Sequence, residues 1–326
     1  MLRFRVLVFC MERECECRTA RGCEPFHAHI RACHVKPFKR TYIEITNACN
    51  LSCTFCPGTS RRVEFMDTGL FESIVAKLGA RCTHLYFHVL GEPLLHPALP
   101  EFLDIAYRRG KLVNLTTNGT LIGSAGAALL EKPAVRQVTF SLHSFAAAGK
   151  RSVEDYVGPI IDFARTARAR HLVSLRLWNE DEPDDTGTCA ALLEIIKREF
   201  PMWLPARRKS GGNLDLCLDK NIFLNPVARF SWPDPNGPDC GTTGYCLALR
   251  EQIAILVDGT AVPCCLDRNG AMALGNIKGQ TMDQIILSDR ARRIHNGFSK
   301  RQVVEPLCRH CSYRLRFSRQ APPAST

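Results

Sequence analysis

The stretch that decides the fold is residues 47–58, NACNLSCTFCPG, where Cys49, Cys53 and Cys56 follow one another as C-x3-C-x2-C. Three thiolates from one short loop can ligate three irons of a cubane [4Fe-4S] cluster, whose fourth iron then lacks a protein ligand. A structural zinc site is closed by four protein ligands, and no His or Cys follows Cys56 at a spacing suitable for the fourth. The pattern therefore predicts an iron-sulfur cluster with one open iron.

Short apolar runs typical of strands alternate with helix-like segments from Tyr42 onward, which indicates parallel βα units. The expected strands are residues 42–45, 84–88, 111–116, 135–142, 171–178 and 221–224. The expected helices are residues 68–78, 98–109, 121–130, 154–170 and 188–200. Six repeats predict an α/β fold with a partial (β/α)6 TIM-like barrel over residues 35–205.

The composition changes after Phe200 to Pro, Gly and Asn, which predicts a linker with irregular loops and the last strand region over residues 206–240. A small α+β domain is expected over residues 241–318. It contains a hairpin turn at Asp258-Gly259 and an amphipathic helix over residues 281–298. The tail, residues 319–326, is expected to be disordered.

Residues 1–34 hold five cysteines and show no clear period. We expect translation to start at Val35, from a valine codon used for initiation, so that residues 1–34 would be an artefact of the chosen start site. The alternative is a real metal-binding or regulatory extension.

The overall composition points to a cytoplasmic protein that uses its cysteines for metal. No stretch of the 326 residues approaches a membrane span or a secretory h-region, so the 17 cysteines are expected to ligate metal rather than form disulfides. The net charge of +11 is concentrated at the two ends: residues 1–40 carry +5 and residues 290–326 carry +8, which leaves about −2 for the middle. This distribution indicates solvated, solubilising ends, and neither a nucleic-acid groove nor a membrane partner is expected.

The C-x3-C-x2-C loop resembles that of the radical S-adenosylmethionine (SAM) superfamily, and the resemblance spans about residues 36–318. It implies that Cys49, Cys53 and Cys56 hold a [4Fe-4S] cluster whose open iron binds SAM, and that Phe55 lies by the adenine. It also implies reductive cleavage of SAM to a 5′-deoxyadenosyl radical, which abstracts hydrogen from a substrate carbon. An external one-electron donor such as flavodoxin or ferredoxin would supply the electron.

Further motifs of this resemblance fall at expected strand ends, where barrel enzymes place their sites. LGEP at 90–93 resembles the GGE(P) motif, so Glu92 is expected to accept the SAM amino group and Gly91 to allow close backbone approach, although Leu90 replaces the first glycine. The other candidate SAM contacts are Asn118 in TTNGT, Ser141 in SLHS and Arg176 in SLRLWN. Each has a structural alternative: a turn at Asn118-Gly119, a helix cap at Ser141 and an ion pair at Arg176.

Histidines near these motifs are expected to serve in packing or loops rather than as ligands: His84, His88, His96 and His143. His143 is the one expected to face the barrel mouth.

A second group of cysteines lies near the C-terminus, as Cys246, Cys264 or Cys265, Cys308 and Cys311. Their spacing alone fits closed zinc or a fully ligated [4Fe-4S] cluster. The flanking segments LVDGTAVPCCLD, LGNI and PLCRHC resemble the SPASM/twitch extension of radical SAM enzymes. The resemblance implies one auxiliary [4Fe-4S] cluster held by Cys246, Cys264, Cys308 and Cys311, with Cys265 able to replace Cys264. Cys217 and Cys240 are expected to be buried or spare thiols.

The expected reaction is a two-electron oxidation, in which the auxiliary cluster accepts an electron from a substrate radical. Two kinds of radical SAM enzyme fit this expectation, a small-molecule dehydrogenase and a peptide-modifying maturase, and the residue that acts on the substrate is not identified. The acidic segment WNEDEPDD at 178–185 is either a substrate-attracting loop for a basic molecule or an ordinary solvated loop. The rival from another class is a non-catalytic iron-sulfur or zinc scaffold or redox sensor.

Overall fold

The computed structural model describes residues 37–149, 151–178, 187–201, 204–208, 214–227, 229 and 231–317. All of them belong to one compact unit, Lys36–Thr326. The predicted extension over residues 1–34, the tail over residues 319–326 and nearly all of the acidic segment at 178–185 lie outside the described residues.

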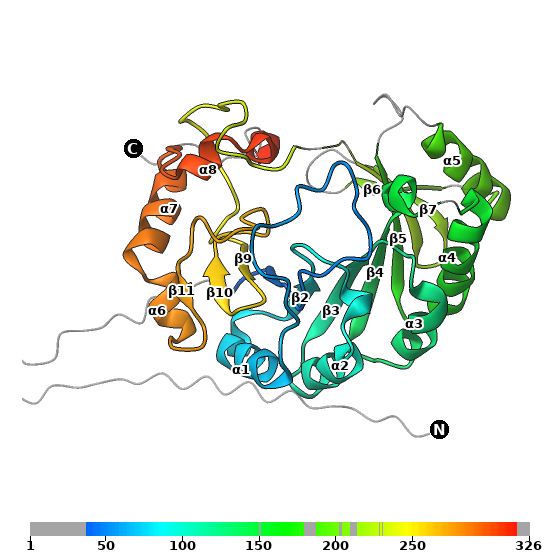
Figure 1. Ribbon diagram of the computed structural model, residues 1–326, viewed down its shortest axis with the longest axis horizontal. Helices are drawn as coiled ribbons and strands as arrows, with labels where there is room; N and C mark the ends of the chain where they lie inside the picture. Colours follow the sequence, from blue (N-terminus) through cyan, green and yellow to red (C-terminus); the bar gives the residue numbers. More distant parts are fainter. Residues whose placement is uncertain are drawn as a thin grey trace, which may run out of the picture. The chain divides into compact units, whose positions relative to one another are not determined.

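One mixed sheet organises this unit, with the strand order β11-β10-β9-β1-β2-β3-β4-β5-β8-β7-β6 (Figure 1). Its parallel centre consists of β9 (Gln252–Ile255), β1 (Arg40–Ile43), β2 (His84–Phe87), β3 (Leu112–Thr117), β4 (Val135–Ser141), β5 (Leu172–Trp178) and β8 (Ile222–Val227). Antiparallel strands extend both edges: β10 (Thr260–Val262) with β11 (Gly275–Asn276), and β7 (Leu214–Asp219) with β6 (Leu204–Arg208).

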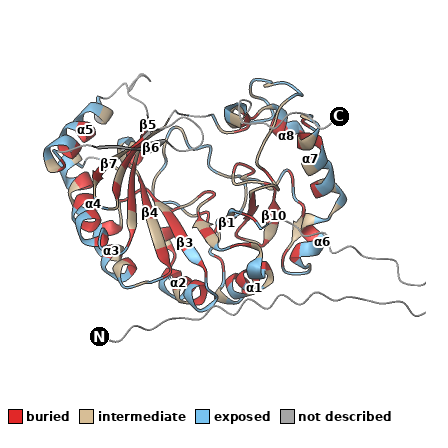
Figure 2. Ribbon diagram, turned by 180° about the vertical axis from the view of Figure 1, so that it is seen from behind, coloured by how far each residue is buried: buried red, intermediate tan, exposed pale blue. Residues whose placement is uncertain are grey.

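Five helices connect the parallel strands and line one face of the sheet (Figure 1). They are α1 (Thr68–Leu78), α2 (Leu99–Arg108), α3 (Ile122–Leu130), α4 (Val153–Ala167) and α5 (Thr188–Glu199). Side-chain caps define two of their starts: Asp67 accepts from the backbone N–H of Leu70 at 2.8 Å and Ser152 from that of Asp155 at 3.0 Å. Figure 2 shows buried residues on the helix faces toward the sheet and exposed residues on the opposite faces.

Four 3-10 segments and three C-terminal helices complete the described part of the chain. The 3-10 turns are η1 (Gly79–Arg81), η2 (Pro93–Leu95), η3 (Leu142–Ala147) and η4 (Ser312–Phe317). The C-terminal helices are α6 (Met282–Ile286), α7 (Asp289–Ser299) and α8 (Pro306–Arg309).

The main core lies between the sheet and the helices α1–α5. Aromatic rings interlock there: Phe71 of α1 stacks on Phe102 of α2 at 4.3 Å between centroids and meets Phe87 of β2 edge-on at 5.5 Å. Burial of such apolar area is the dominant stabilising term of a domain of this kind.

The opposite face of the sheet, called the inner face below, carries polar side chains. The strand register makes Tyr42 the neighbour of Tyr86 and Tyr86 the neighbour of Asn114. It also places Arg176 of β5 between Ser141 of β4 and Asn225 of β8. Because side chains alternate across a strand, these residues share one face.

The predicted partial (β/α)6 barrel and its small C-terminal α+β domain are confirmed, with the six expected strands and five expected helices present. The hairpin at Asp258-Gly259 is also present, as β9 and β10. Two details were wrong. The stretch after Phe200, expected to form irregular loops, contains β6 and β7. The helix expected over residues 281–298 is divided, because Ser288 accepts from the backbone N–H of Ala291 at 3.3 Å and begins α7.

Candidate functional site

The C-x3-C-x2-C loop leaves the carboxyl end of β1 and crosses the ends of the following strands. Cys49 and Cys56 are exposed and Cys53 is half-buried. Asn118, directly after β3, points its amide nitrogen at Cys49 Sγ at 3.9 Å and donates to Asn50 Oδ1 at 2.9 Å. Burial raises the pKa of Cys53 to about 11, against a hydrogen bond from Ser144 that lowers it. The loop therefore presents three thiols together at the edge of the sheet where the other predicted motifs end.

Glu92 joins the LGEP motif to the end of β3. Its carboxylate is buried and accepts from the backbone N–H of Leu94 at 3.0 Å, from Thr117 Oγ1 at 2.7 Å and from the backbone N–H of Asn118 at 2.7 Å. Burial raises the pKa of Glu92, and these hydrogen bonds lower it. A carboxylate has about four acceptor sites, so one remains for a further donor.

Gly91 is required by a close approach of two backbone segments. Its φ is +80°, and a Cβ at this position would lie 2.3 Å from the carbonyl oxygen of Thr46. The backbone N–H of Glu92 donates to the carbonyl of Ala48 at 2.7 Å, next to Cys49. The LGEP segment is thus held directly against the cysteine loop, as its predicted role requires.

Three further predicted SAM contacts follow the ends of β1, β3 and β4: Phe55, Asn118 and Ser141. Phe55 lies 5.2 Å from His143, ring centroid to centroid, and His143 follows Ser141 at the end of β4. Ser141 makes no capping hydrogen bond to η3, so the cap alternative does not apply. Asn118 does form the turn considered as its alternative, since its Oδ1 accepts from the backbone N–H of Thr120 at 3.0 Å, while its Nδ2 faces the cysteine loop.

Arg176 lies beside Ser141 in the strand register and acts on the pKa of His143, and it also faces groups of the C-terminal domain. The groups that act most on its pKa, after burial, are Tyr313, Tyr42 and Cys265, from η4, β1 and the C-terminal domain. Burial lowers the pKa of Arg176. Within the described part of the chain it forms no ion pair, although the carboxylate of Asp215 acts on its pKa.

The predicted auxiliary ligands converge in the C-terminal domain. Cys246, Cys264, Cys308 and Cys311 line a single cavity together with apolar residues such as Met272. Cys308 Sγ lies 3.6 Å from Met272 Sδ. This set of four soft donors fits a fully ligated iron-sulfur cluster, and the set of three in the first loop fits a cluster with one open iron. No group of three or more His, Cys, Asp or Glu among the described residues has the arrangement of ligands to a single metal ion.

The adjacent Cys264 and Cys265 face different surroundings. Cys264 lines the cavity of the four cysteines, whereas Cys265 packs on Tyr42 at the inner face and hydrogen-bonds to its side chain. Cys217 and Cys240 do not line the cavity; their thiols donate to the carbonyls of Asp219 at 3.3 Å and Pro238 at 3.7 Å. Geometry therefore groups Cys264, and not Cys265, with the other three.

Arg314 holds the wall of this cavity, although the sequence predicts a solvated, basic C-terminal segment there. It is 2% exposed, and its guanidinium donates to the carbonyls of Cys308 and Thr243, each at 2.9 Å, and to those of Cys240 and Gly241. A buried arginine that satisfies several carbonyls fixes the loops that carry them. The spacing of residues along the chain contains no signal for this role.

A buried ion pair connects the two cysteine-bearing regions. Arg61, five residues after Cys56, donates from Nη2 to Glu44 Oε1 at 2.7 Å and from Nε to the carbonyl of Arg268 at 2.8 Å. Glu44 is fully buried at the end of β1, and its Oε2 accepts from the backbone N–H of Val257 at 3.1 Å. Burial raises the pKa of Glu44 more than Arg61 lowers it. The pair therefore fixes the cysteine loop against the C-terminal domain, although burying the Glu44 carboxylate costs electrostatic free energy.

Replacing Arg61 by Ala is expected to destabilise the protein strongly, by about 3–5 kcal/mol, because it leaves the buried Glu44 carboxylate without its counter-charge. Arg62→Ala is the matched control. The side chain of Arg62 is 87% exposed and pairs with Glu64 only at 4.0 Å, so its loss is expected to change the free energy of unfolding by about 0.5 kcal/mol or less. Thermal melts of the reconstituted proteins measure both, and equal melting temperatures for the two variants would contradict a positional role for Arg61.

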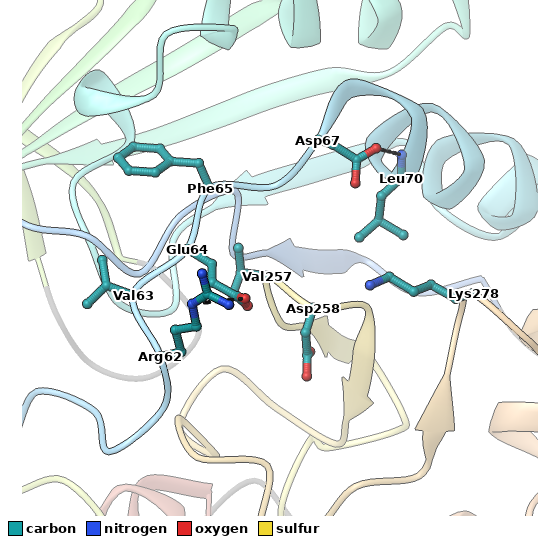
Figure 3. A pocket seen from close by; sticks show the side chains of 9 residues that line it. All are labelled: Arg62, Val63, Glu64, Phe65, Asp67, Leu70, Val257, Asp258 and Lys278. Atoms are coloured by element: carbon teal, nitrogen blue, oxygen red, sulfur yellow. Dashed lines mark hydrogen bonds and ion pairs between the residues drawn. The ribbon is translucent and has the colours of Figure 1, made fainter.

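A separate cavity of about 390 Å³ lies beside this connection (Figure 3). Its lining residues are Arg62, Val63, Glu64, Phe65, Asp67, Leu70, Val257, Asp258 and Lys278. Both signs of charge line it and no cysteine does, so it is distinct from the two cysteine groups.

Among the described residues, no helix is long and apolar enough to cross a membrane.

Two family models match the chain. The radical SAM superfamily model matches residues 43–174, and the model of the iron-sulfur cluster-binding domain SPASM matches residues 246–312. Together they imply one [4Fe-4S] cluster with SAM and auxiliary iron-sulfur binding.

Curated relatives come from the same superfamily. A tungsten-containing aldehyde ferredoxin oxidoreductase cofactor-modifying protein of Pyrococcus furiosus is 33% identical over 324 residues, which cover 85% of this chain and 88% of that protein. A GTP 3′,8-cyclase of Chlorobaculum tepidum is 35% identical over 96 residues, 27% of this chain and 28% of that protein. A PqqA peptide cyclase of Gluconobacter oxydans is 25% identical over 180 residues, 53% of this chain and 47% of that protein. The chain thus spans less than half the length of the latter two relatives.

Solved structures share the fold. BtrN in complex with AdoMet and 2-DOIA has a TM-score of 0.53 at 16% identity, with 85% of this chain and 94% of that chain covered. The anSMEcpe enzyme with bound AdoMet and Cp18Cys peptide has a TM-score of 0.55 at 15% identity, with 86% and 88% covered. At these identities the likeness concerns the fold alone. From the family models and the long match to the Pyrococcus protein, the chain belongs to the radical SAM superfamily and carries a SPASM domain at its C-terminal end.

Proposed function

We propose that this radical SAM enzyme abstracts hydrogen from a substrate carbon and oxidises the resulting radical through one auxiliary [4Fe-4S] cluster. The observation that carries the proposal is the division of the cysteines into two groups. Three lie in one open loop and four line one cavity, so the first group leaves a coordination position for a ligand and the second does not.

Cys49, Cys53 and Cys56 are the proposed ligands of the SAM-binding cluster. Glu92 is the proposed acceptor of the SAM amino group, supported by its free acceptor capacity beside the loop. The proposed pocket is completed by Phe55, Gly91, Asn118 and Ser141. When bound, the cofactors supply the reductive cleavage of SAM to a 5′-deoxyadenosyl radical and an acceptor for one electron from the substrate.

The protein contributes position and electrostatics around these groups. Asn118 and Glu92 hold the ends of β2 and β3 against the cysteine loop, and Arg61 with Glu44 keeps this loop in register with the C-terminal domain. Cys246, Cys264, Cys308 and Cys311 are the proposed ligands of the auxiliary cluster, in a cavity walled by Arg314. Oxidation of a substrate radical needs the two cofactor sites at a fixed separation, which this framework provides.

The proposed substrate is a peptide or a small molecule. The relatives named as a peptide cyclase, a GTP cyclase and a cofactor-modifying protein support both classes. An external one-electron donor such as flavodoxin or ferredoxin is the proposed reductant.

Anaerobic reconstitution followed by iron counting and reduction in the presence of SAM tests the proposal. About eight irons per chain and formation of 5′-deoxyadenosine are the expected results. A preparation that holds mainly zinc, or one that binds iron and releases no 5′-deoxyadenosine, would instead favour a scaffold or redox sensor.

A further inference from the structure

The inner face of the sheet is more polar than a buried parallel sheet normally is. Parallel strands covered on both faces are typically apolar throughout. Here, by contrast, polar side chains from four neighbouring strands share the inner face: Tyr86, Asn114, Thr139, Ser174 and Arg176. Buried polar groups cost free energy unless they find partners. This face is therefore suited to contact a polar molecule.

Most polar groups on this face already have partners within the protein. Thr116 Oγ1 and His88 Nδ1 are 3.1 Å apart, and Gln137 Nε2 donates to Thr139 Oγ1 at 3.0 Å. Arg136 donates to Asn114 Oδ1 at 3.1 Å. The face is thus prearranged by its own hydrogen bonds.

Arg176 carries an unsatisfied donor on this face. Its Nε is shielded from solvent and has no hydrogen-bond partner among the described residues. Asp215, the carboxylate that acts on its pKa, accepts a hydrogen bond from Asn225 Nδ2 and does not pair with it. A guanidinium placed in this way has its charge and at least one donor available.

Apart from Asp215, the groups that act on the pKa of Arg176 are hydroxyl and thiol groups. These groups belong to Tyr42, Tyr313 and Cys265, and Cys265 is adjacent to Cys264 of the auxiliary site. His88 stays neutral, because burial and the charge of Arg176 lower its pKa to about 3. A half-buried cation whose carboxylate neighbour Asp215 is hydrogen-bonded to Asn225 favours an anion over a neutral or basic group.

We propose that Arg176 binds an anionic group of the substrate, a carboxylate or a phosphate, at the inner face between the two cysteine groups, and does not bind the carboxylate of SAM. This inference rests on the proposed function, since it takes the inner face as the place of the substrate. It also disagrees with the alternative of a basic substrate, which the acidic segment at 178–185 suggested. That segment lies almost wholly outside the described residues. A guanidinium can hold either oxyanion with two parallel hydrogen bonds.

Calorimetric titration of the anaerobic holoenzyme, saturated with SAM, tests this role with inorganic phosphate and, separately, with acetate as probes. Wild type is expected to bind at least one of them, and the preferred probe identifies a phosphate or a carboxylate substrate. Arg176→Gln is expected to weaken that binding about tenfold or more, as for loss of a charged hydrogen bond, and Arg176→Lys to restore part of it. Arg136→Gln is the matched control, expected to leave the affinity unchanged because Arg136 already has protein partners.

The affinities of SAM and decarboxylated SAM separate this role from one in the SAM pocket. Arg176→Gln is expected to leave both unchanged. If it weakens SAM and not decarboxylated SAM, Arg176 serves the SAM carboxylate and the proposal is overturned. Absence of anion binding to wild type, or equal binding by wild type and Arg176→Gln, overturns it as well. Formation of 5′-deoxyadenosine, assayed in the same preparations, reports on the proposed function independently of these titrations.

Discussion

Cys53→Ala is expected to abolish the formation of 5′-deoxyadenosine from SAM. The first loop offers three thiols and no spare donor at its spacing, so a cluster with only two protein ligands cannot be held in the same way. Cys53 is half-buried, whereas Cys49 and Cys56 are exposed, and its carbonyl accepts from the backbone N–H of Cys56 at 3.0 Å. Chromatographic measurement of 5′-deoxyadenosine after reduction with SAM checks the expectation.

Cys217→Ser is the matched control for this variant. Cys217 lies on β7 and donates to the carbonyl of Asp219, away from both cysteine groups, so its replacement is expected to leave 5′-deoxyadenosine formation and iron content as in wild type. Iron content of Cys53→Ala is expected to fall by about four atoms per chain, with the auxiliary cluster retained. Equal amounts of 5′-deoxyadenosine from wild type and Cys53→Ala would contradict radical chemistry at the first loop.

The parts of the fold that depend on local pattern could be predicted from the sequence. Helix α1 begins and ends at the predicted residues, because Asp67 caps its start and Gly79, with a φ of +49°, follows its end. The strands were located within two or three residues for the same reason, since apolar runs and turn residues mark their limits. Likewise, the three-cysteine loop is a contiguous segment whose chemistry follows from its spacing alone.

Features that depend on contacts between distant segments could not be predicted. The hydrogen bond from Arg61 to the carbonyl of Arg268 joins residues 207 positions apart, and nothing near either residue indicates the other. Arg314 belongs to a basic segment, and only the folded chain shows its burial against the carbonyls of Thr243 and Cys308. Similarly, the hairpin of β6 and β7 lies in a stretch whose Pro and Gly content is typical of loops.

The choice between Cys264 and Cys265 depends on the direction in which each side chain points, and a sequence pattern does not give this direction. Cys264 and Cys265 lie in a bend and turn just after β10, where the local backbone conformation decides which way each side chain points. Cys264 faces the cavity with Cys246, Cys308 and Cys311, and Cys265 faces Tyr42 on the inner face. This difference leads to the second strong prediction.

Cys264→Ala is expected to remove the auxiliary cluster while sparing SAM cleavage. Iron content should fall by about four atoms per chain, because the cavity then offers only three thiolates to a cluster that is otherwise fully ligated. The melting temperature should fall as well, since metal binding to a closed site contributes directly to folding stability. Formation of 5′-deoxyadenosine is expected to continue, because the first loop is unchanged. With substrate present, the variant is expected to form no oxidised product.

Cys265→Ala separates the two cysteines by the same measurements. It is expected to retain the iron of both clusters, because Cys265 does not line the cavity and instead contacts Tyr42. The two variants remove the same thiol group from adjacent positions, so a difference in iron content between them reports on ligand geometry and not on cysteine number. If Cys265→Ala loses about four irons and Cys264→Ala does not, the ligand is Cys265 and the cluster lies against the inner face, beside Arg176.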